Sequence, residues 1–571
     1  MALRSANWLG DGGKNGFIAR HHLRAMGLGP AQFDGKPVIG IASTWSELTP
    51  CNANLRGLAD HVRRGVVQAG GVALEFPVMS LSEPLLRPTS MIYRNLAAIQ
   101  FEEDIRAHPL DAVVLLTGCD KTTPAALMGA ASADVPAIVV TSGPMLNGKY
   151  RGRDVGSGTD IWKMTEDLRA GVISPAEFTE FESCLNRSAG HCMTMGTAST
   201  MSCLAEALGM ALPGMAALPA PDSRRAVLAE RTGVRAVELA LAGGPTPSQV
   251  LTGAAFENAV KVLAALGGST NAVIHLLAIA GRAGVPLDLA AIDRLGAEVP
   301  VLVDLMPSGR WLMEEFAYAG GMPALLAELS PLLDTSVTTV YGTLADGCRP
   351  APPGEVIRPL ADPVLPAGNG IAVLHGNLVP DGAVIKVSAA TAELLTHTGP
   401  ALVFDSLEEY LAVSDDPALP VTADTVLVVR NLGPRGYPGM PEVGNLPLPA
   451  VLLAQGIRDL VRLSDARMSG TAFGTVVLHA APEASVGGPL ALLRTGDQVR
   501  LDVPNRALDM LVDADELEAR RRAWAPTRTP RTGEDRGWIR LYREHVTGAD
   551  TGADLDFLVG ASPDIVPRQA F

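Results

Sequence analysis

The 571-residue sequence contains few charged residues, few aromatic residues and few cysteines. Charged residues make up 19% of the chain and aromatic residues 4%, whereas hydrophobic residues make up 47%. This composition is typical of a well-packed globular protein and excludes an intrinsically disordered one. Six cysteines are too few for a disulfide scaffold in a chain of this size, so we expect thiols, metal ligands or catalytic groups. The length itself predicts two or more domains.

Long basic blocks and membrane-spanning apolar runs are also missing. The net charge is −15, so nucleic acid is not an expected partner. Residues 2–14 are polar and lack the apolar centre of a signal peptide. Residues 264–281 are uncharged, but their Gly-Gly-Ser-Thr-Asn opening and His275 favour a buried loop and helix over a membrane span. We therefore expect a cytoplasmic protein with no membrane partner.

Apolar runs typical of buried strands alternate with helical patterns in the first part of the chain. Leu55, Leu58, Val62 and Val66 have helical spacing, and a second helical pattern surrounds residues 125–131. The predicted strands are residues 37–42, 73–79, 111–117 and 136–141. Strands separated by helices predict an α/β domain with a parallel sheet, whose functional sites form at the carboxyl ends of the strands.

The pattern changes after a proline-rich stretch at residues 350–366. Residues 198–333 are mostly helical, whereas short β runs separated by turns follow the prolines. These runs are residues 371–374, 383–387, 401–404, 425–429 and 499–503. They predict a C-terminal β-barrel-like domain with a few helices. We place the N-terminal parallel-sheet α/β domain at residues 1–365 and the second domain at residues 366–571.

Three of the six cysteines lie in loops of one kind. Cys51 and Cys119 follow predicted strands, and Cys192 lies in a glycine-containing loop before a helix predicted to begin near Thr197. A free cysteine is most often a small buried apolar residue. We expect that role for the other three, Cys184, Cys203 and Cys348.

Three thiolates from distant loops do not suit structural zinc, which prefers closely spaced pairs. They suit an iron–sulfur cluster in which one iron lacks a protein ligand. Such an iron is a Lewis acid that can accept a departing hydroxide. From spacing alone, buried thiols and cluster ligands both remain open.

Three carboxylates and a lysine form a second candidate set. Asp120 and Lys121 share the loop of the second cysteine, Glu83 follows the second predicted strand, and Glu442 lies in a Pro/Gly loop of the second domain. Each carboxylate alone fits a solvated surface position. Together they could hold Mg²⁺, which prefers oxygen ligands. An ammonium group would repel the cation, so Lys121 fits only if it is carbamylated and presents a carboxylate.

Ser469 lies in the glycine-containing loop SDARMSGT, residues 464–471. Most serines in such loops cap helices or turns. An unassisted hydroxyl is too weakly acidic to serve as a base. A cation lowers the pKa of bound water from about 15.7 to about 7 and can act on an alcohol in the same way. Beside a metal ion, Ser469 is therefore a candidate base.

Six motifs carry a family resemblance over nearly the whole chain. They are TPCN around Cys51, GCDKTTPA from Gly118, GHCMTMGTASTM from Gly190, GGSTNAVIHLLAIAG from Gly267, PGMPEVGN from Pro438 and SDARMSGTAFG from Ser464. In this order they resemble the dihydroxy-acid and sugar-acid dehydratase family. The chain is most similar to the aldonate, L-arabinonate dehydratase-like branch. The cues are Glu83 in place of the aspartate typical of the branched-chain amino-acid enzymes, SDARMSG, and the tail HVTGADTGADLDFL from His545.

The resemblance implies a hydro-lyase that converts a sugar acid, such as L-arabinonate or D-xylonate, to its 2-keto-3-deoxy acid. It also implies a homodimer or homotetramer, and it assigns no role to His191. The implied ligands and base are Cys51, Cys119 and Cys192 for a [2Fe–2S] cluster, Glu83, Asp120, carbamylated Lys121 and Glu442 for Mg²⁺, and Ser469 as the base.

Three alternatives remain. The first is the same chemistry on 2,3-dihydroxy-isovalerate, as a dihydroxy-acid dehydratase of branched-chain amino-acid synthesis. The second is 6-phosphogluconate dehydration with a [4Fe–4S] cluster. The third is a redox-sensing or electron-transfer protein, which we rank far lower because an open iron and a nearby magnesium set would serve no purpose there.

Overall fold

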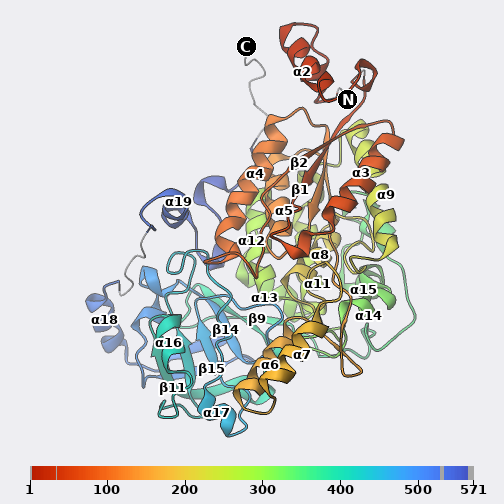
Figure 1. The fold of residues 1–571 in the computed structure, drawn as a ribbon. Coiled ribbons are helices and arrows are strands. Elements are labelled where there is room, and N and C mark those ends of the chain that lie inside the picture. Colours follow the sequence, from red (N-terminus) through yellow and green to blue (C-terminus); the bar gives the residue numbers. More distant parts are fainter. Residues whose placement is uncertain (1–2, 34, 527–532, 563–571) are drawn as a thin grey trace.

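A four-stranded parallel sheet organises the first part of the chain (Figure 1). The computed structural model describes residues 3–33, 35–526 and 533–562. The strand order is β2-β1-β3-β4, and all neighbours are parallel. The strands are β1 (Val38–Ser43), β2 (Val72–Pro77), β3 (Ala112–Thr117) and β4 (Ala137–Thr141). Because every residue of β1, β3 and β4 is buried, these strands are continuous apolar runs, as expected of a sheet covered on both faces.

Helices cover both faces of this sheet (Figure 1). α3 (Leu55–Gln68) packs with α9 (Ser223–Ala242) on one side, and α4 (Arg94–Ala107), α5 (Thr122–Ala133) and α12 (Asn271–Ala283) pack on the other. The apolar stripe of α3 is buried, as its helical spacing predicts. α5 is buried over its whole length. Its Gly129 allows close contact with α4, since a Cβ there would lie 2.8 Å from the Ala98 carbonyl oxygen.

The remaining elements of the first part are mostly helical. α6 and α7 lie beside the C-terminal sheet at the lower edge of the molecule in Figure 1. These elements are α1 (Ala6–Leu9), α2 (Lys14–Arg24), β5 (Gly148–Tyr150), β6 (Arg153–Val155), α6 (Thr159–Arg169), α7 (Pro175–Leu185), α8 (Thr197–Ala207), α10 (Pro247–Val250), α11 (Gly253–Ala265), α13 (Leu289–Ala297), α14 (Met313–Tyr318), α15 (Gly321–Leu329), β7 (Thr338–Thr339) and β8 (Gly342–Thr343).

A mixed eight-stranded sheet organises the C-terminal part. Its order is β16-β15-β11-β12-β13-β14-β10-β9, with parallel pairing from β11 to β14 and antiparallel pairing elsewhere. A bridge between His375 and Ala507 links the two edges, so the sheet is nearly closed. The elements are β9 (Ile371–Leu374), β10 (Gly382–Lys386), β11 (Thr396–Phe404), α16 (Leu407–Val413), β12 (Val426–Val429), α17 (Ala450–Ala454), β13 (Arg462–Ser464), β14 (Val476–Ala481), β15 (Gln498–Asp502), β16 (Ala507–Met510), α18 (Ala514–Ala523) and α19 (Gly537–His545).

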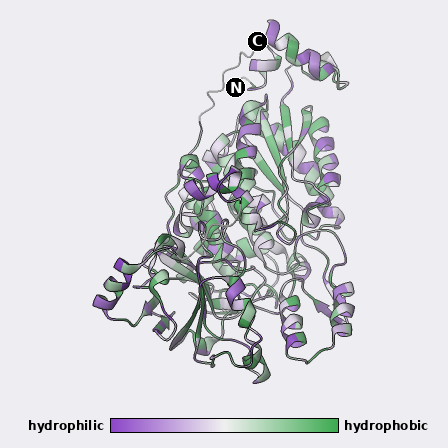
Figure 2. Cartoon of the chain, turned by 60° about the vertical axis from the view of Figure 1, so that its left-hand side comes forward, coloured by the Kyte–Doolittle hydropathy of each residue, from purple (hydrophilic) through white to green (hydrophobic). Residues whose placement is uncertain are grey.

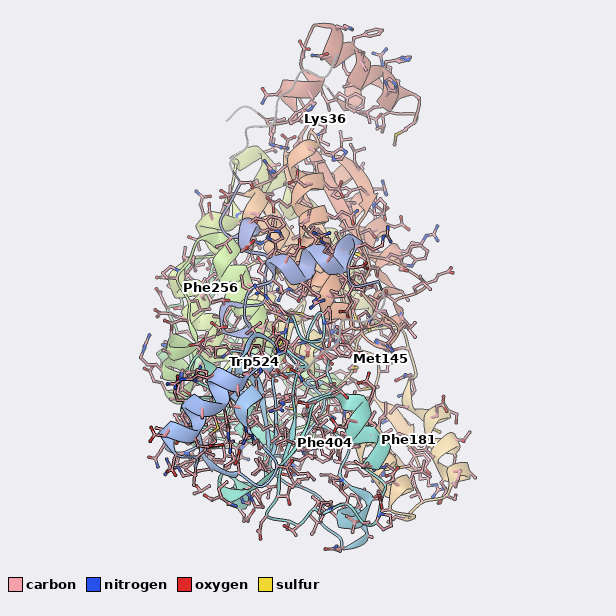
Figure 3. All side chains as sticks on the ribbon, turned by 90° about the vertical axis from the view of Figure 1, so that its left-hand side faces the viewer. Lys36, Met145, Phe181, Phe256, Phe404 and Trp524 are labelled. Carbon is pink, nitrogen blue, oxygen red and sulfur yellow. The ribbon has the colours of Figure 1, made fainter. Side chains whose placement is uncertain are left out.

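One apolar core joins the two parts. Val384, Met468 and Leu478 of the C-terminal part belong to the same buried cluster as the strands of the parallel sheet. Figure 2 shows hydrophobic strands inside and hydrophilic faces on the outer helices. In Figure 3, Phe256 lies among the helices of the first part and Phe404 lies in the second. Burial of shared apolar surface therefore fixes how the parts meet.

The structure confirms the predicted fold class. Each strand predicted from an apolar run is present within a few residues. The short strands β5 to β8 and the strands β13, β14 and β16 were not predicted. Near the proposed boundary, Ile357 and Leu365 form bridges with Val303 and Val301, so the chain still pairs with the first part there. Within the described ranges, no helix is long and apolar enough to cross a membrane.

Candidate active site

The three cysteines selected from their loops lie together near the carboxyl edge of the parallel sheet. Cys119 follows β3, Cys51 lies in a short 3-10 helix beyond β1, and Cys192 lies in the loop before α8. The thiol of Cys51 is in hydrogen-bonding contact with Cys119, and Cys192 interacts electrostatically with both. Three distant loops thus supply one group of sulfur atoms.

The other cysteines have separate settings. Cys203 is buried within α8. Cys184 packs against a small apolar cluster that includes Phe181. The Cys348 thiol lies 3.5 Å from the carbonyl oxygen of Leu344. Cys203 is buried as expected, whereas Cys184 and Cys348 are partly exposed.

The surroundings of the clustered thiols favour their protonated form. The contact with Cys119 and burial raise the pKa of Cys51 well above its ordinary value. Burial, followed by the charge of Asp120, raises the pKa of Cys192 to about 12. Thiolates at these positions therefore require added positive charge. A metal centre supplies such charge and deprotonates a coordinating thiol.

The predicted carboxylates form a compact group beside the sulfur atoms. One carboxylate oxygen from each of Glu83, Asp120 and Glu442 lies within 4.8 Å of the other two. Lys121 is fully buried among them. Its Nζ lies 3.0 Å from Glu83 Oε2, 3.2 Å from Glu442 Oε1 and 3.7 Å from Asp120 Oδ2. The structure thus brings together all four residues of the predicted magnesium set, although 321 positions separate Lys121 from Glu442.

The positive charge beside these three carboxylates does not balance their negative charge. Burial, followed by Glu83, raises the pKa of Glu442 to about 7. Burial also raises the pKa of Asp120, because it outweighs the attraction of Lys121. Burial acts on Glu83 as well, but Lys121 and Arg467 together lower the pKa of that carboxyl. The group is therefore short of cations, as a site for a metal ion should be.

Glu442 is held by two residues that the sequence analysis did not select. Arg467 Nη1 and Asn271 Nδ2 each lie 2.7 Å from Glu442 Oε1. Arg467 is fully buried and also donates to the carbonyl oxygen of Met440 and to Asn271 Oδ1. Both residues lie inside quoted motifs, but partners this far apart in sequence carry no local signal. A buried donor pair of this kind fixes the orientation of the carboxylate.

Ser469 lies two residues beyond Arg467 in the same loop. Its Oγ is 2.9 Å from Thr471 Oγ1, and the backbone N–H of Thr471 donates to it at 3.4 Å. Trp162 of α6 donates its indole N–H to Thr471 Oγ1 at 3.2 Å. Because indole is only a donor, the Thr471 hydroxyl accepts from Trp162, and its own proton is free to point at Ser469 Oγ. If Ser469 loses its proton, both the hydroxyl and the backbone N–H of Thr471 can donate to Ser469 Oγ, which would stabilise the deprotonated form.

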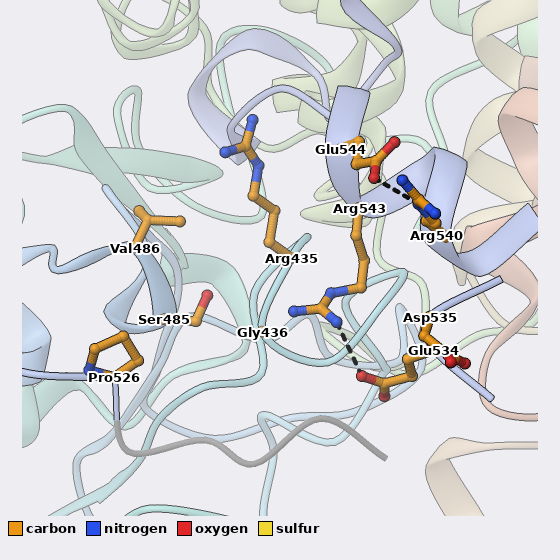
Figure 4. Close-up of a pocket in the computed structure, with 10 residues that line it drawn as sticks. All are labelled: Arg435, Gly436, Ser485, Val486, Pro526, Glu534, Asp535, Arg540, Arg543 and Glu544. Carbon is orange, nitrogen blue, oxygen red and sulfur yellow. Dashed lines mark hydrogen bonds and ion pairs between the residues drawn. The ribbon is translucent and has the colours of Figure 1, made fainter. Parts of the chain in front are cut away.

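A cavity of about 270 Å³ opens beside this group. Its walls come from α6, α16 and the loops around Glu442 and Phe473. A second cavity, of about 470 Å³, has none of the predicted site residues in its walls (Figure 4). Its Arg543 pairs with Glu534 at 3.1 Å and its Arg540 with Glu544 at 2.7 Å. Of these two cavities, the first is the one that a predicted site residue, Glu442, lines.

Comparison with known families agrees with this arrangement. Residues 36–347 match the dihydroxy-acid/6-phosphogluconate dehydratase N-terminal model, and residues 355–553 match the C-terminal model. The chain belongs to the dihydroxy-acid/6-phosphogluconate dehydratase family, and it is a hydro-lyase.

Relatives with curated names point to the aldonate branch. The chain is 56% identical to the L-arabonate dehydratase of Azospirillum brasilense, over 100% of this chain and 99% of the relative. It is 53% identical to the L-arabinonate dehydratase of Rhizobium leguminosarum bv. trifolii, over 100% and 98%. Identity falls to 41% with the dihydroxy-acid dehydratase of Mycobacterium bovis, over 94% of each chain. These likenesses place the chain with sugar-acid dehydratases.

Proposed function

We propose that this protein dehydrates a five- or six-carbon aldonate, such as L-arabinonate or D-xylonate, to its 2-keto-3-deoxy acid. One observation carries the proposal. Three thiols and three carboxylates form adjoining groups, and Asp120 interacts electrostatically with the thiols of Cys51 and Cys192. A soft and a hard metal site placed side by side suit an acid substrate that must lose a hydroxyl group.

The donor sets fit the two implied groups. Cys51, Cys119 and Cys192 would hold a [2Fe–2S] cluster, because the three thiols leave one ligand position open. Glu83, Asp120, Glu442 and carbamylated Lys121 would hold Mg²⁺. Carbamylation turns Lys121 from a cation into an anion, so four negative groups would face only Arg467. When bound, the two groups would supply Lewis acids for the departing 3-hydroxyl and for the substrate carboxylate and enolate.

Side chains of the protein would then carry out the proton transfer and hold the ligands in place. Ser469 Oγ takes the proton from C2, while Thr471 donates to that oxygen and stabilises its charge. Loss of the C2 proton and of the 3-hydroxyl gives an enol and one water molecule. The enol tautomerises to the 2-keto-3-deoxy acid. Arg467 and Asn271 keep Glu442 in place throughout.

A keto-acid assay on anaerobically reconstituted protein tests the proposal. The panel should contain aldonates of three to six carbons, 2,3-dihydroxy-isovalerate and 6-phosphogluconate. We expect the highest kcat/KM with a five- or six-carbon aldonate. The alternative, a dihydroxy-acid dehydratase, is supported by the 41% identical relative. Preference for 2,3-dihydroxy-isovalerate would establish that alternative instead.

A further inference from the structure

The cavity beside Glu442 extends away from the carboxylate group towards α6. Glu442 forms one part of its wall, and Phe473, which follows the Ser469 loop, forms another. Trp162 lines it as well and is fixed by its hydrogen bond to Thr471. A molecule bound at the carboxylates and Ser469 would therefore have room for a longer chain in this direction.

The basic residues of the cavity are already paired. Arg462 donates to the carbonyl oxygen of Leu446 and pairs with Asp459 at 2.9 Å. Arg169 donates to the carbonyl oxygen of Leu448 at 2.7 Å and also pairs with Asp415. The terminal nitrogens of both guanidinium groups therefore support the walls, and the one Arg462 donor without a partner among the described residues, Nε, is buried.

Glu166 is the one acidic residue of this wall besides Glu442. Among the described residues, none donates a hydrogen bond to its carboxylate or forms an ion pair with it, and burial raises the pKa of that carboxyl. A carboxylate only accepts hydrogen bonds, so its complement is a ligand that brings donors. Trp162 and Phe473 supply apolar surface beside it, which suits the C–H groups of a polyhydroxylated chain.

We propose that this cavity is the subsite for substrate carbons beyond C3, and that Glu166 selects a neutral, hydroxylated end. A distal hydroxyl donates to the Glu166 carboxylate, whereas a distal phosphate or sulfonate is repelled by it. A substrate without a distal hydroxyl leaves the half-buried carboxylate unpaired, which costs affinity. The inference rests on the proposed aldonate dehydratase function and names the residue that limits its substrate range.

The test compares three variants of the cofactor-loaded protein on three acids. Glu166→Ala removes the acceptor, and Glu166→Gln removes only the charge. Asp167→Asn is the matched control, because Asp167 is the next residue of α6 and pairs with Arg458 outside the cavity wall. The acids are L-arabinonate, 6-phosphogluconate, and glycerate, whose carbon chain ends at C3. Melting temperatures confirm that each variant is folded.

Glu166→Ala should lower kcat/KM for L-arabinonate at least about tenfold, mainly through KM, because a hydrogen bond to a charged group is lost. It should change the value for glycerate by less than about twofold, as expected when no contact is lost. Glu166→Gln should raise kcat/KM for 6-phosphogluconate relative to L-arabinonate at least about tenfold, since a like-charge contact is removed. Asp167→Asn should match the wild type.

Equal losses on L-arabinonate and glycerate would overturn the subsite, because the change would then act on the whole site. An unchanged ratio of 6-phosphogluconate to L-arabinonate in Glu166→Gln would overturn the role of the charge. Failure of the wild-type protein to dehydrate any aldonate is a different result, and it would overturn the proposed function itself.

Discussion

At the scale of single residues, Lys121 sets the charge of the site. As an ammonium group it sits within 3.7 Å of three carboxylates, and with Arg467 it neutralises two of them. The charges of those three carboxylates outweigh burial and Arg467, so its pKa is raised. As a carbamate it would add a fourth negative group and leave the site in need of a divalent cation. The two states of this one side chain therefore correspond to a partly neutralised ion-pair network and to a metal site.

The cysteine assignment predicts a sharp difference between two serine variants. Cys119→Ser should lose most of its bound iron and visible colour. Changes in residues that only orient metal ligands cost about 10–100-fold in affinity or activity, and loss of a ligand should cost at least as much. Cys203→Ser is the matched control, because this thiol is buried in α8 away from the sulfur group. Iron content and absorbance spectra are the measurements, and equal iron in both variants would contradict the assignment.

Ser469→Ala should keep the bound metals and lose turnover. A positioned general base contributes about 10²–10⁴-fold, so kcat and kcat/KM should fall together by that range. Exchange of the substrate C2 proton with deuterated solvent is the direct measurement, because it needs the base but not the departure of the hydroxide. Exchange at the wild-type rate in the alanine variant would show that another group is the base.

Because of the buried His479, we expect the free energy of unfolding to fall at acidic pH. Burial, followed by the charge of Arg467, lowers its pKa from 6.5 to about 3. Neither ring nitrogen has a hydrogen-bond partner among the described residues. Below pH 6.5 this histidine is protonated in the unfolded chain but stays neutral in the folded protein. Stability therefore falls as the pH falls. Between pH 6.5 and 4.5 this costs about 2 kcal/mol, because the full slope of about 1.4 kcal/mol per pH unit applies only once the unfolded histidine is mostly protonated.

His479→Asn should remove that part of the acid sensitivity. Asparagine does not titrate, and it tolerates the positive φ of 57° at this position. Urea midpoints at pH 6.5 and 4.5 measure the effect. If the variant loses as much stability as the wild type over this interval, the titrating group lies elsewhere.

At the scale of elements, the sequence predicted positions along strands but not the contacts between distant loops. The apolar runs predicted β1 to β4. The loops at their carboxyl ends pointed to Cys51, Glu83 and Cys119 as site residues, because parallel strands place their carboxyl ends at one edge of the sheet. β13 was missed because it is three residues long and contains Arg462. Asn271 and Arg467 were missed because they are 196 positions apart. Their partnership exists only after both halves of the chain are packed together.

The C-terminal segment docks on α4 and α12 through a buried ion-pair network. Arg282 Nη1 lies 3.0 Å from Glu102 Oε2, and its Nε lies 2.5 Å from Asp554 Oδ2. All three side chains are at most 5% exposed. Arg282→Ala should destabilise the protein by about 3–5 kcal/mol, because two buried carboxylates lose their partner.

Chemical denaturation measures this loss, and limited proteolysis near residue 554 should become faster. Arg540→Ala is the control, since its pair with Glu544 on α19 is exposed and should contribute little. Similar midpoints for the two variants would show that the buried network does not hold the segment.

At the scale of the whole molecule, the candidate site is shared between the two parts of the chain. Glu83, Asp120 and Lys121 come from the first part, and Glu442 and Ser469 come from the second. The expected homodimer or homotetramer stays a prediction, which sedimentation of the purified protein would check. The pairing of Glu442 with Lys121 and Arg467 already couples the assembly of the site to the packing of the two parts.

Because the site is shared, the exposed connection at residues 349–355 affects the rate at which the site forms. While the chain is intact, this short connection keeps the two parts at a high effective concentration, for which about millimolar is typical of short links. Cleavage there would turn formation of the site into a second-order reaction between two fragments. Activity of the cut protein would then fall with dilution, and ligands that touch both fragments would restore it by mass action.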